Sequence, residues 1–295
     1  MNTWSGPCTG RWSLANLCSV QVIARRRNQV PAHVYFVGSA VFHYLGPAFA
    51  VLLFARVDVL GVAWLRIASA AAVFAAWKRP WRAINPLTIQ LGVVLAVMNC
   101  CFYEAISRLP LGTVAAIEFL GVIVLAAIGV RSRRNALALG LAVAGVYVLT
   151  DVRIAGEPLG LAFAFANAVL FALYIVLAHR VAQRVEGVDG LGAAMLVALV
   201  AVTPMAGWAA VPALADPVAL AAGIGVGVCS SVIPYVCDQL AMARLPRATY
   251  ALLVSLLPAT ATLIGLIVLT QVPSPAEVAG VALVVLGVAF HEGAE

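Results

Sequence analysis

Long apolar segments follow one another through most of this 295-residue chain, and this pattern constrains the fold more than any other feature. Hydrophobic residues make up 64% of the sequence and charged residues only 10%, whereas a soluble domain carries about 25% charged residues. A globule could not bury so much apolar surface, so the sequence predicts an all-α polytopic protein within a lipid bilayer. The net charge of +6 then reflects membrane topology, and we expect no nucleic-acid partner.

The apolar segments have the length of transmembrane helices, which need roughly 17–25 residues to cross the hydrocarbon layer. The loops between them are short, so we expect function to reside in the helices. The sequence predicts ten transmembrane helices, at about 34–55, 59–77, 87–107, 111–130, 135–151, 159–178, 190–211, 217–243, 248–270 and 275–291.

The distribution of basic residues predicts the orientation of the chain in the membrane. If the N-terminus lies in the cytosol, the inside segments hold 14 basic residues and the outside loops hold three. Basic residues accumulate on the cytoplasmic side of membrane proteins. We therefore expect both termini to be cytoplasmic and residues 1–33 to form a cytosolic tail.

The motif Arg-Leu-Pro occurs twice between long apolar spans, at 108–110 and again at 244–246. It separates the third span from the fourth and the eighth span from the ninth, so the chain divides into two five-helix halves, 34–151 and 159–291. Because five is odd, the second half enters the membrane upside down. The sequence thus predicts two inverted repeats, an architecture of secondary transporters.

Polar residues inside the spans are the candidate site, because a charge at mid-membrane costs about 2.5–3.5 kcal/mol and normally faces a cavity or a partner. Arg66 and Glu118 lie at similar depth, so we expect an ion pair between them. That pair is either structural or also in contact with a zwitterionic or anionic solute. Asn99 and Tyr103 form a polar stripe on the third span.

A second polar cluster lies on the eighth span, where Ser231, Pro234, Tyr235 and Asp238 share one helix face. Pro234 frees a backbone carbonyl and can kink the helix, which membrane proteins tolerate next to cavities. We expect Asp238 to line the solute path and to bind a proton or a solute ammonium group. The alternative is a structural aspartate that its neighbours satisfy by hydrogen bonds.

The weaker candidates for this pathway are His43, Glu104, Ser255 and Pro258. A lone histidine inside a span is more often a packing residue than a proton carrier, and Glu104 precedes Arg108 by four residues, the spacing of a helical ion pair. The six cysteines show no metal-binding spacing, and the sequence has neither a catalytic motif nor a nucleotide-binding P-loop. We expect no metal, no cofactor and no enzyme activity.

Three stretches, 64–82, 98–121 and 230–259, resemble the EamA-domain branch of the drug/metabolite transporter superfamily, and the similarity runs from about residue 34 to 290. Asp238 stands where the family pattern has a glutamate, so the carboxylate is kept. The departures from the pattern are Leu257 in place of a carboxylate, Thr270-Gln271 in place of Gly-Glu and Val122 in place of a proline. The resemblance implies a ten-helix carrier of the bacterial inner membrane that expels small metabolites and is driven by the proton gradient. The positions that match the family pattern are Arg66, Met98, Asn99, Phe102, Tyr103, Glu118, Phe119, Pro234, Tyr235 and Pro258.

Three functions remain open at this point. The first is proton-coupled export of amino acids, such as threonine or homoserine, by alternating access. The second is a carrier of the same superfamily for drugs, nucleosides or sugars, working as an importer or an exporter. The third is a channel or an intramembrane enzyme. The intramembrane charges favour a charged or zwitterionic small-molecule substrate, and the sequence leaves the direction, the coupling ion and a homodimeric assembly open.

Overall fold

The computed structural model is helical in the residues that it describes, which are 32–77, 79–129, 132–153, 157–185, 189–234, 237 and 256–290. These ranges contain no strand, so the predicted all-α class is confirmed for them. A 3-10 turn, η1 (Pro80–Ala83), and a π-helical turn, η2 (Val228–Val232), join the α-helices. The α-helices are α2 (Ala32–Leu53), α3 (Val59–Trp77), α4 (Pro86–Ile106), α5 (Leu111–Gly129), α6 (Arg133–Arg153), α7 (Pro158–Ala182), α8 (Asp189–Ala215), α9 (Pro217–Gly227), α12 (Leu257–Leu269) and α13 (Pro275–Phe290).

Most helix bounds agree with the expected spans to within a few residues. Helices α6, α7 and α8 are longer than expected. The 135–151 span gains two residues at each end, and the 159–178 and 190–211 spans each gain four at the C-terminal end. The expected spans 217–243 and 248–270 fall partly outside the described residues. Proline and a capping side chain set several of the starts; for example, Asp216 Oδ1 accepts the Val218 N–H at 2.9 Å ahead of Pro217.

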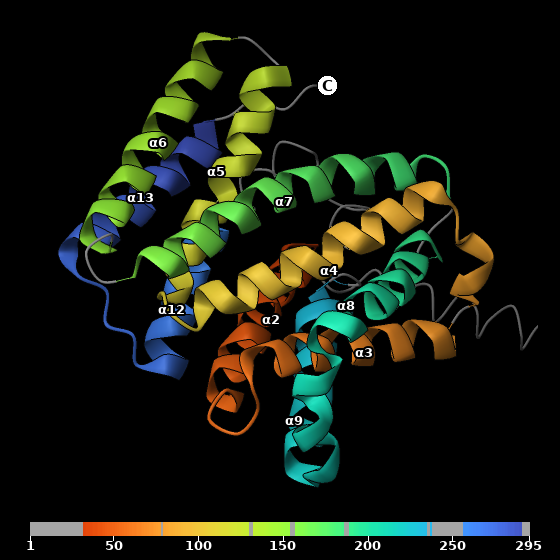
Figure 1. Cartoon of the computed structure of the whole chain (residues 1–295). Helices are drawn as coiled ribbons and strands as arrows, with labels where there is room; N and C mark the ends of the chain where they lie inside the picture. Colours follow the sequence, from red (N-terminus) through yellow and green to blue (C-terminus); the bar gives the residue numbers. More distant parts are fainter. Residues whose placement is uncertain are drawn as a thin grey trace, which may run out of the picture.

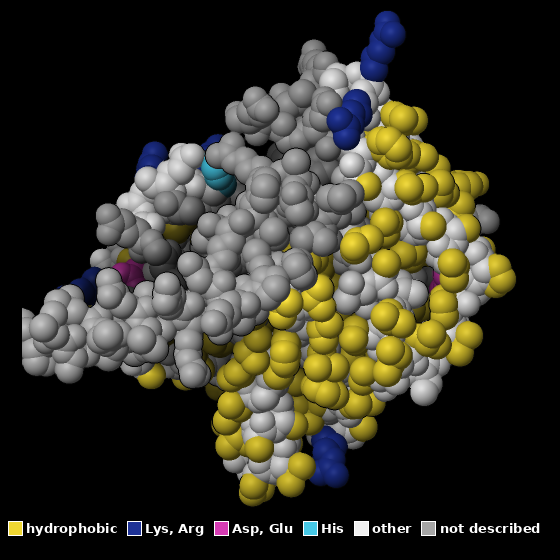
Figure 2. Space-filling model, turned by 180° about the vertical axis from the view of Figure 1, so that it is seen from behind, with side chains coloured by type: hydrophobic (Ala, Val, Ile, Leu, Met, Phe, Trp, Pro, Cys, Tyr) yellow, Lys and Arg dark blue, Asp and Glu magenta, His cyan; other side chains and the backbone are white. Residues whose placement is uncertain are grey.

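Five of the described helices, namely α2 from Val34 onward, α3, α4, α7 and α8, are long and apolar enough to cross a membrane by length and composition. Parts of four more helices, α5, α9 with η2, α12 and α13, are shorter but apolar. Many large hydrophobic side chains remain exposed on the described surface. Figure 2 shows them as a broad field on one face, with basic side chains at its edges. That is the surface expected of a protein surrounded by lipid.

The connections between helices gather alternately at two ends of the bundle. At one end, Arg56 after α2 forms an ion pair with Asp216 before α9 (3.6 Å). At the start of α5, the Leu111 N–H donates to Gln271 Oε1, which belongs to the segment between α12 and α13 (3.1 Å). The turn η1, at the far end of α3, packs against the start of α8. Successive helices connected at these ends, such as α2 and α3, therefore run in opposite directions.

Helices from the two halves of the chain pack mainly against each other. Helix α3 packs on α8, α5 packs on α12, and α6 packs on α13 (Figure 1). Helix α4 packs on α7 and α8, while α9 packs on α2 and α3. The α6–α13 crossing is close because Gly145 faces the Gly280 carbonyl, and a Cβ at Gly145 would lie 2.6 Å from that oxygen.

Candidate functional site

A small cavity lies between α2, α3, α4, α5, α7, α8 and η2, and it has a volume of about 140 Å³. Pockets for drug-sized ligands are larger, roughly 300–1,000 Å³. The cavity collects predicted site residues that lie far apart in the sequence. Those that line it are His43, Arg66, Asn99, Glu118, Ser231 and Pro234.

Arg66 extends from α3 into this cavity and is held by groups from two other elements. Its Nε donates to Ser231 Oγ at 3.2 Å, and its Nη2 donates to the Ser230 carbonyl at 3.4 Å. Its guanidinium also lies over the ring of Tyr103 in α4, 5.6 Å from the ring centre. Arg66 is therefore fixed in place, and its Nη1 atom takes no part in these bonds.

The local structure of η2 explains why a backbone carbonyl is available to Arg66. Pro234 follows Ser230 by four residues and has no N–H, so it cannot donate to the Ser230 carbonyl as a helical residue would. The π-helical turn instead pairs the Ile233 N–H with the Val228 carbonyl. The expectation that Pro234 frees a carbonyl is confirmed, and Arg66 occupies the freed acceptor.

Glu118 lies on α5 and is only 8% exposed. It lines the same cavity as Arg66. However, no nitrogen of the Arg66 side chain comes within 4.0 Å of a Glu118 carboxylate oxygen. The predicted direct ion pair is therefore wrong. The two opposite charges line the same cavity without a direct contact between them.

Asn167 on α7 lies beside the Glu118 carboxylate, and sequence reasoning missed it. It is 1% exposed, and its Nδ2 has no hydrogen-bond partner among the described residues. Ser230 Oγ and the Tyr103 hydroxyl are buried without a partner in the same way. Each such group costs about 1–3 kcal/mol unless a ligand or water satisfies it. A signal for Asn167 was present, because it is the only amide in the expected span 159–178.

The rest of the cavity wall is apolar and aromatic. The rings of Phe171 and Tyr174 stack with their centres 5.8 Å apart, and Met98 and Met195 line the cavity with them. Asn99, also at the wall, is 4% exposed and donates from Nδ2 to the Leu95 carbonyl at 2.8 Å, so its amide group is partly used within its own helix.

Three of the remaining candidates do not line the cavity. Tyr103 is fully buried behind Arg66 and supports it from outside the cavity lining. Glu104 forms the predicted helical ion pair with Arg108, which is thus confirmed. Pro258 is buried in α12 and does not line the cavity. Three of the predicted residues fall outside the described residues: Tyr235, Asp238 and Ser255.

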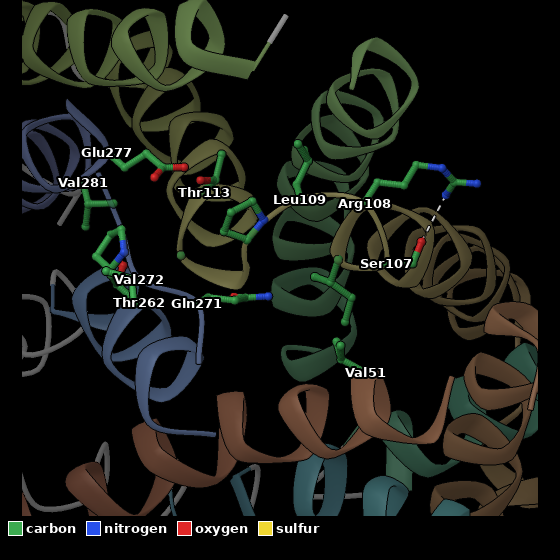
Figure 3. A pocket seen from close by; sticks show the side chains of 14 residues that line it. Val51, Ser107, Arg108, Leu109, Thr113, Thr262, Gln271, Val272, Glu277 and Val281 are labelled. Carbon is green, nitrogen blue, oxygen red and sulfur yellow. Dashed lines mark hydrogen bonds between the residues drawn. The ribbon is translucent and has the colours of Figure 1, made fainter. Parts of the chain in front are cut away.

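A second, larger cavity of about 340 Å³ lies where the α4–α5 loop meets the segment between α12 and α13 (Figure 3). Its polar side chains serve the local structure. Gln271 accepts the Leu111 N–H, and Glu277 Oε2 accepts the Ser274 N–H at 2.8 Å. Figure 3 shows Arg108 extending away from Gln271. The cavity that contains Arg66 is thus the better candidate for a solute site.

The described residues thus combine apolar helices of membrane-spanning length with an internal cavity that two opposite charges line, as in proteins that move a solute across a membrane. Among the described residues, no group of three or more His, Cys, Asp or Glu side chains could hold a metal ion. The model of the EamA-like transporter family matches residues 158–291. The threonine/homoserine exporter RhtA of Escherichia coli (strain K12) is 30% identical over 241 residues, which cover 78% of this chain and 80% of the relative. The RhtA of Salmonella typhimurium (strain LT2) is 30% identical over 237 residues, 77% of this chain and 79% of the relative.

The chain belongs to the EamA-like transporter family. It is therefore a membrane transporter and not an enzyme, and the family resemblance noted in the sequence is confirmed. One solved crystal structure shares the fold with a TM-score of 0.58 and 20% sequence identity, over 88% of this chain and 95% of the solved chain.

Proposed function

We propose that this transporter exports small amino acids, such as threonine or homoserine, through the cavity that contains Arg66. The observation that carries the proposal is the pair of opposite charges, Arg66 and Glu118, in a cavity of about 140 Å³. A small zwitterion matches both the size and the charges of this space. Relatives that are 30% identical to the chain are threonine/homoserine exporters, which supports the same substrate class.

We further propose that the chain has ten transmembrane helices in two inverted repeats, 34–151 and 159–291. The packing supports this arrangement, because exchanging the halves maps each main contact onto an observed one: α4 on α7 becomes α9 on α2, and α4 on α8 becomes α9 on α3. The pairs α3–α8, α5–α12 and α6–α13 map onto themselves. The family model also matches a segment, 158–291, that coincides with the second repeat. Such an architecture supports alternating access.

The basic residues support an orientation with both termini in the cytoplasm of a bacterium, and the protein in its inner membrane. Reporter fusions at Gly156 and Gly190 test this orientation. We expect the fusion at Gly156 to report the outside and the fusion at Gly190 to report the cytosol. The same side for both would contradict the inverted repeat.

Proton coupling is proposed to use Asp238, which follows Pro234 by one helical turn in the sequence. The change Asp238→Asn keeps the shape of the side chain but removes its ability to titrate. We expect this variant to fold and insert but to lose transport driven by a pH gradient, or to lose the pH dependence of transport. Transport with wild-type pH dependence would return Asp238 to a structural role.

The main test is transport of labelled threonine and homoserine by the purified protein in liposomes, with and without an imposed pH gradient. The second candidate function, a carrier for lipophilic drugs, predicts no saturable amino-acid transport. The cavity volume argues against it, because it lies below the range of pockets for drug-sized ligands. Saturable, gradient-driven amino-acid transport supports the proposal, and its absence would remove it.

A further inference from the structure

The cavity holds two charged groups of opposite sign that do not pair with each other. Arg66 donates to a hydroxyl and a carbonyl but contacts no carboxylate among the described residues. Glu118 forms no salt bridge with a described arginine, and its polar neighbour is the neutral amide of Asn167. Uncompensated charges in a membrane-embedded site are costly, so such groups normally have a partner.

We infer that the cavity recognises the α-amino-acid head group itself: Arg66 binds the carboxylate, and Glu118 binds the ammonium group. We call this pair of contacts the clamp. This inference rests on the proposed function and specifies how its substrate is recognised. A zwitterion placed between the two residues gives each of them a direct contact with an opposite charge. Neither a cation nor an anion alone could do so.

The two charged ends are built differently, which sets the orientation of the ligand. Ser230 and Ser231 hold Nε and Nη2 of the guanidinium, and Tyr103 lies against its face. Nη1 takes no part in these bonds, so it is the group that can donate to a carboxylate. Glu118 comes from α5 and has Asn167 as its buried polar neighbour. The unpartnered Nδ2 of Asn167 shows that this part of the cavity is polar and incompletely satisfied.

The remaining wall receives the side chain of the ligand. The stacked pair Phe171–Tyr174 and the flexible side chains of Met98 and Met195 offer an apolar surface with little directional preference. The structure therefore assigns strict recognition to the head group, with looser selection of the side chain by size. Small amino acids should compete with one another, whereas compounds that lack either head-group charge should not.

The test measures the binding of three compounds to the purified full-length protein: L-threonine, L-threoninamide, which lacks the carboxylate, and N-acetyl-L-threonine, which lacks the ammonium group. We expect wild type to bind threonine roughly 10- to 100-fold more tightly than either analogue, as the loss of one charged hydrogen-bonded contact predicts. Arg66→Gln should remove the discrimination against threoninamide only. Glu118→Gln should remove the discrimination against N-acetyl-threonine only.

Matched controls change the same residue types outside the cavity. Arg56→Gln alters an arginine whose side chain is 61% exposed, and Glu104→Gln alters the partner of Arg108. Both controls should keep the wild-type order of affinities. Variants that weaken all three compounds equally while keeping the discrimination would overturn the clamp.

If a cavity variant does not fold, the affinities of the wild-type protein for the three compounds still test the inference. Equal affinity for all three compounds, together with saturable threonine transport in liposomes, overturns the clamp and leaves the proposed function standing. If the protein neither binds nor transports any amino acid, both the clamp and the proposed function are wrong. Selective loss of discrimination in the two variants supports the clamp.

Discussion

A close approach beside the proposed site lies between Gly46 of α2 and Ser230 of η2, and it gives a sharp test of the packing. A Cβ at position 46 would lie 2.8 Å from the Ser230 nitrogen and 2.9 Å from its Cβ. Ordinary contacts between carbon atoms are about 3.5–4.0 Å. The Ser230 Oγ could rotate away, but the Ser230 nitrogen and Cβ could not. In Gly46→Ala, α2 and η2 would therefore have to separate by about 0.7 Å or more.

This separation should affect both stability and transport. Overpacking of a well-packed site costs about 1–3 kcal/mol, which corresponds to roughly 2–10 °C in apparent melting temperature for a protein of this size. Moving Ser230 also moves the carbonyl that holds Arg66 Nη2 at 3.4 Å. We therefore expect amino-acid binding to weaken more than in a variant that is destabilised equally at a distant site.

Gly225→Ala is the matched control, because a Cβ there meets no atom within 4 Å. This change should leave binding intact and should stabilise α9 by about 0.5–1 kcal/mol, since alanine favours a helix over glycine. The assays are thermal melting in detergent and threonine binding, measured on both variants. If Gly46→Ala melts and binds like Gly225→Ala, then α2 and η2 do not pack as described.

Two further predictions concern stability away from the cavity. Thr270 ends α12 with φ 55°, a conformation that costs a β-branched residue about 1–2 kcal/mol, so Thr270→Gly should raise the apparent melting temperature, and a lower value would show that the hydroxyl contributes more than the strain costs. Trp64→Phe removes the bond from Nε1 to Thr203 Oγ1 (2.9 Å) between α3 and α8 and should cost about 0.5–1.5 kcal/mol. Thr203→Val should cost about the same, and adding it to Trp64→Phe should cost little more; full additivity would rule the bond out.

The bounds of the helices could be predicted from the sequence because they depend on local features. Apolar runs give the length of a helix, and pairs such as Asp216-Pro217 give its start. The π-helical turn η2 could not be predicted, because Val228–Val232 contains neither proline nor glycine. Its geometry depends on Pro234 further along the chain and on tertiary contacts with Gly46 and Arg66.

The candidate site was predicted where a residue is conspicuous by itself. Arg66 and Glu118 stand out because charges are rare inside apolar spans, and the Glu104–Arg108 pair follows from helical spacing. The direct Arg66–Glu118 pair was wrong because equal depth along the membrane normal says nothing about which way each side chain points around its helix. Asn167 was missed because its significance depends on the neighbour that only the fold provides.

Arg66 connects ligand recognition to the arrangement of the two halves. The arginine belongs to the first half of the chain, but the groups that fix its guanidinium, Ser230 and Ser231, belong to the second. A rearrangement that separates α3 from η2 must therefore release Arg66, while one that keeps them together preserves the free edge of the guanidinium. A ligand shifts a conformational equilibrium only by its differential affinity for the two states. A carboxylate bound to Arg66 would supply that difference, because its binding energy depends on the same contacts that join the halves.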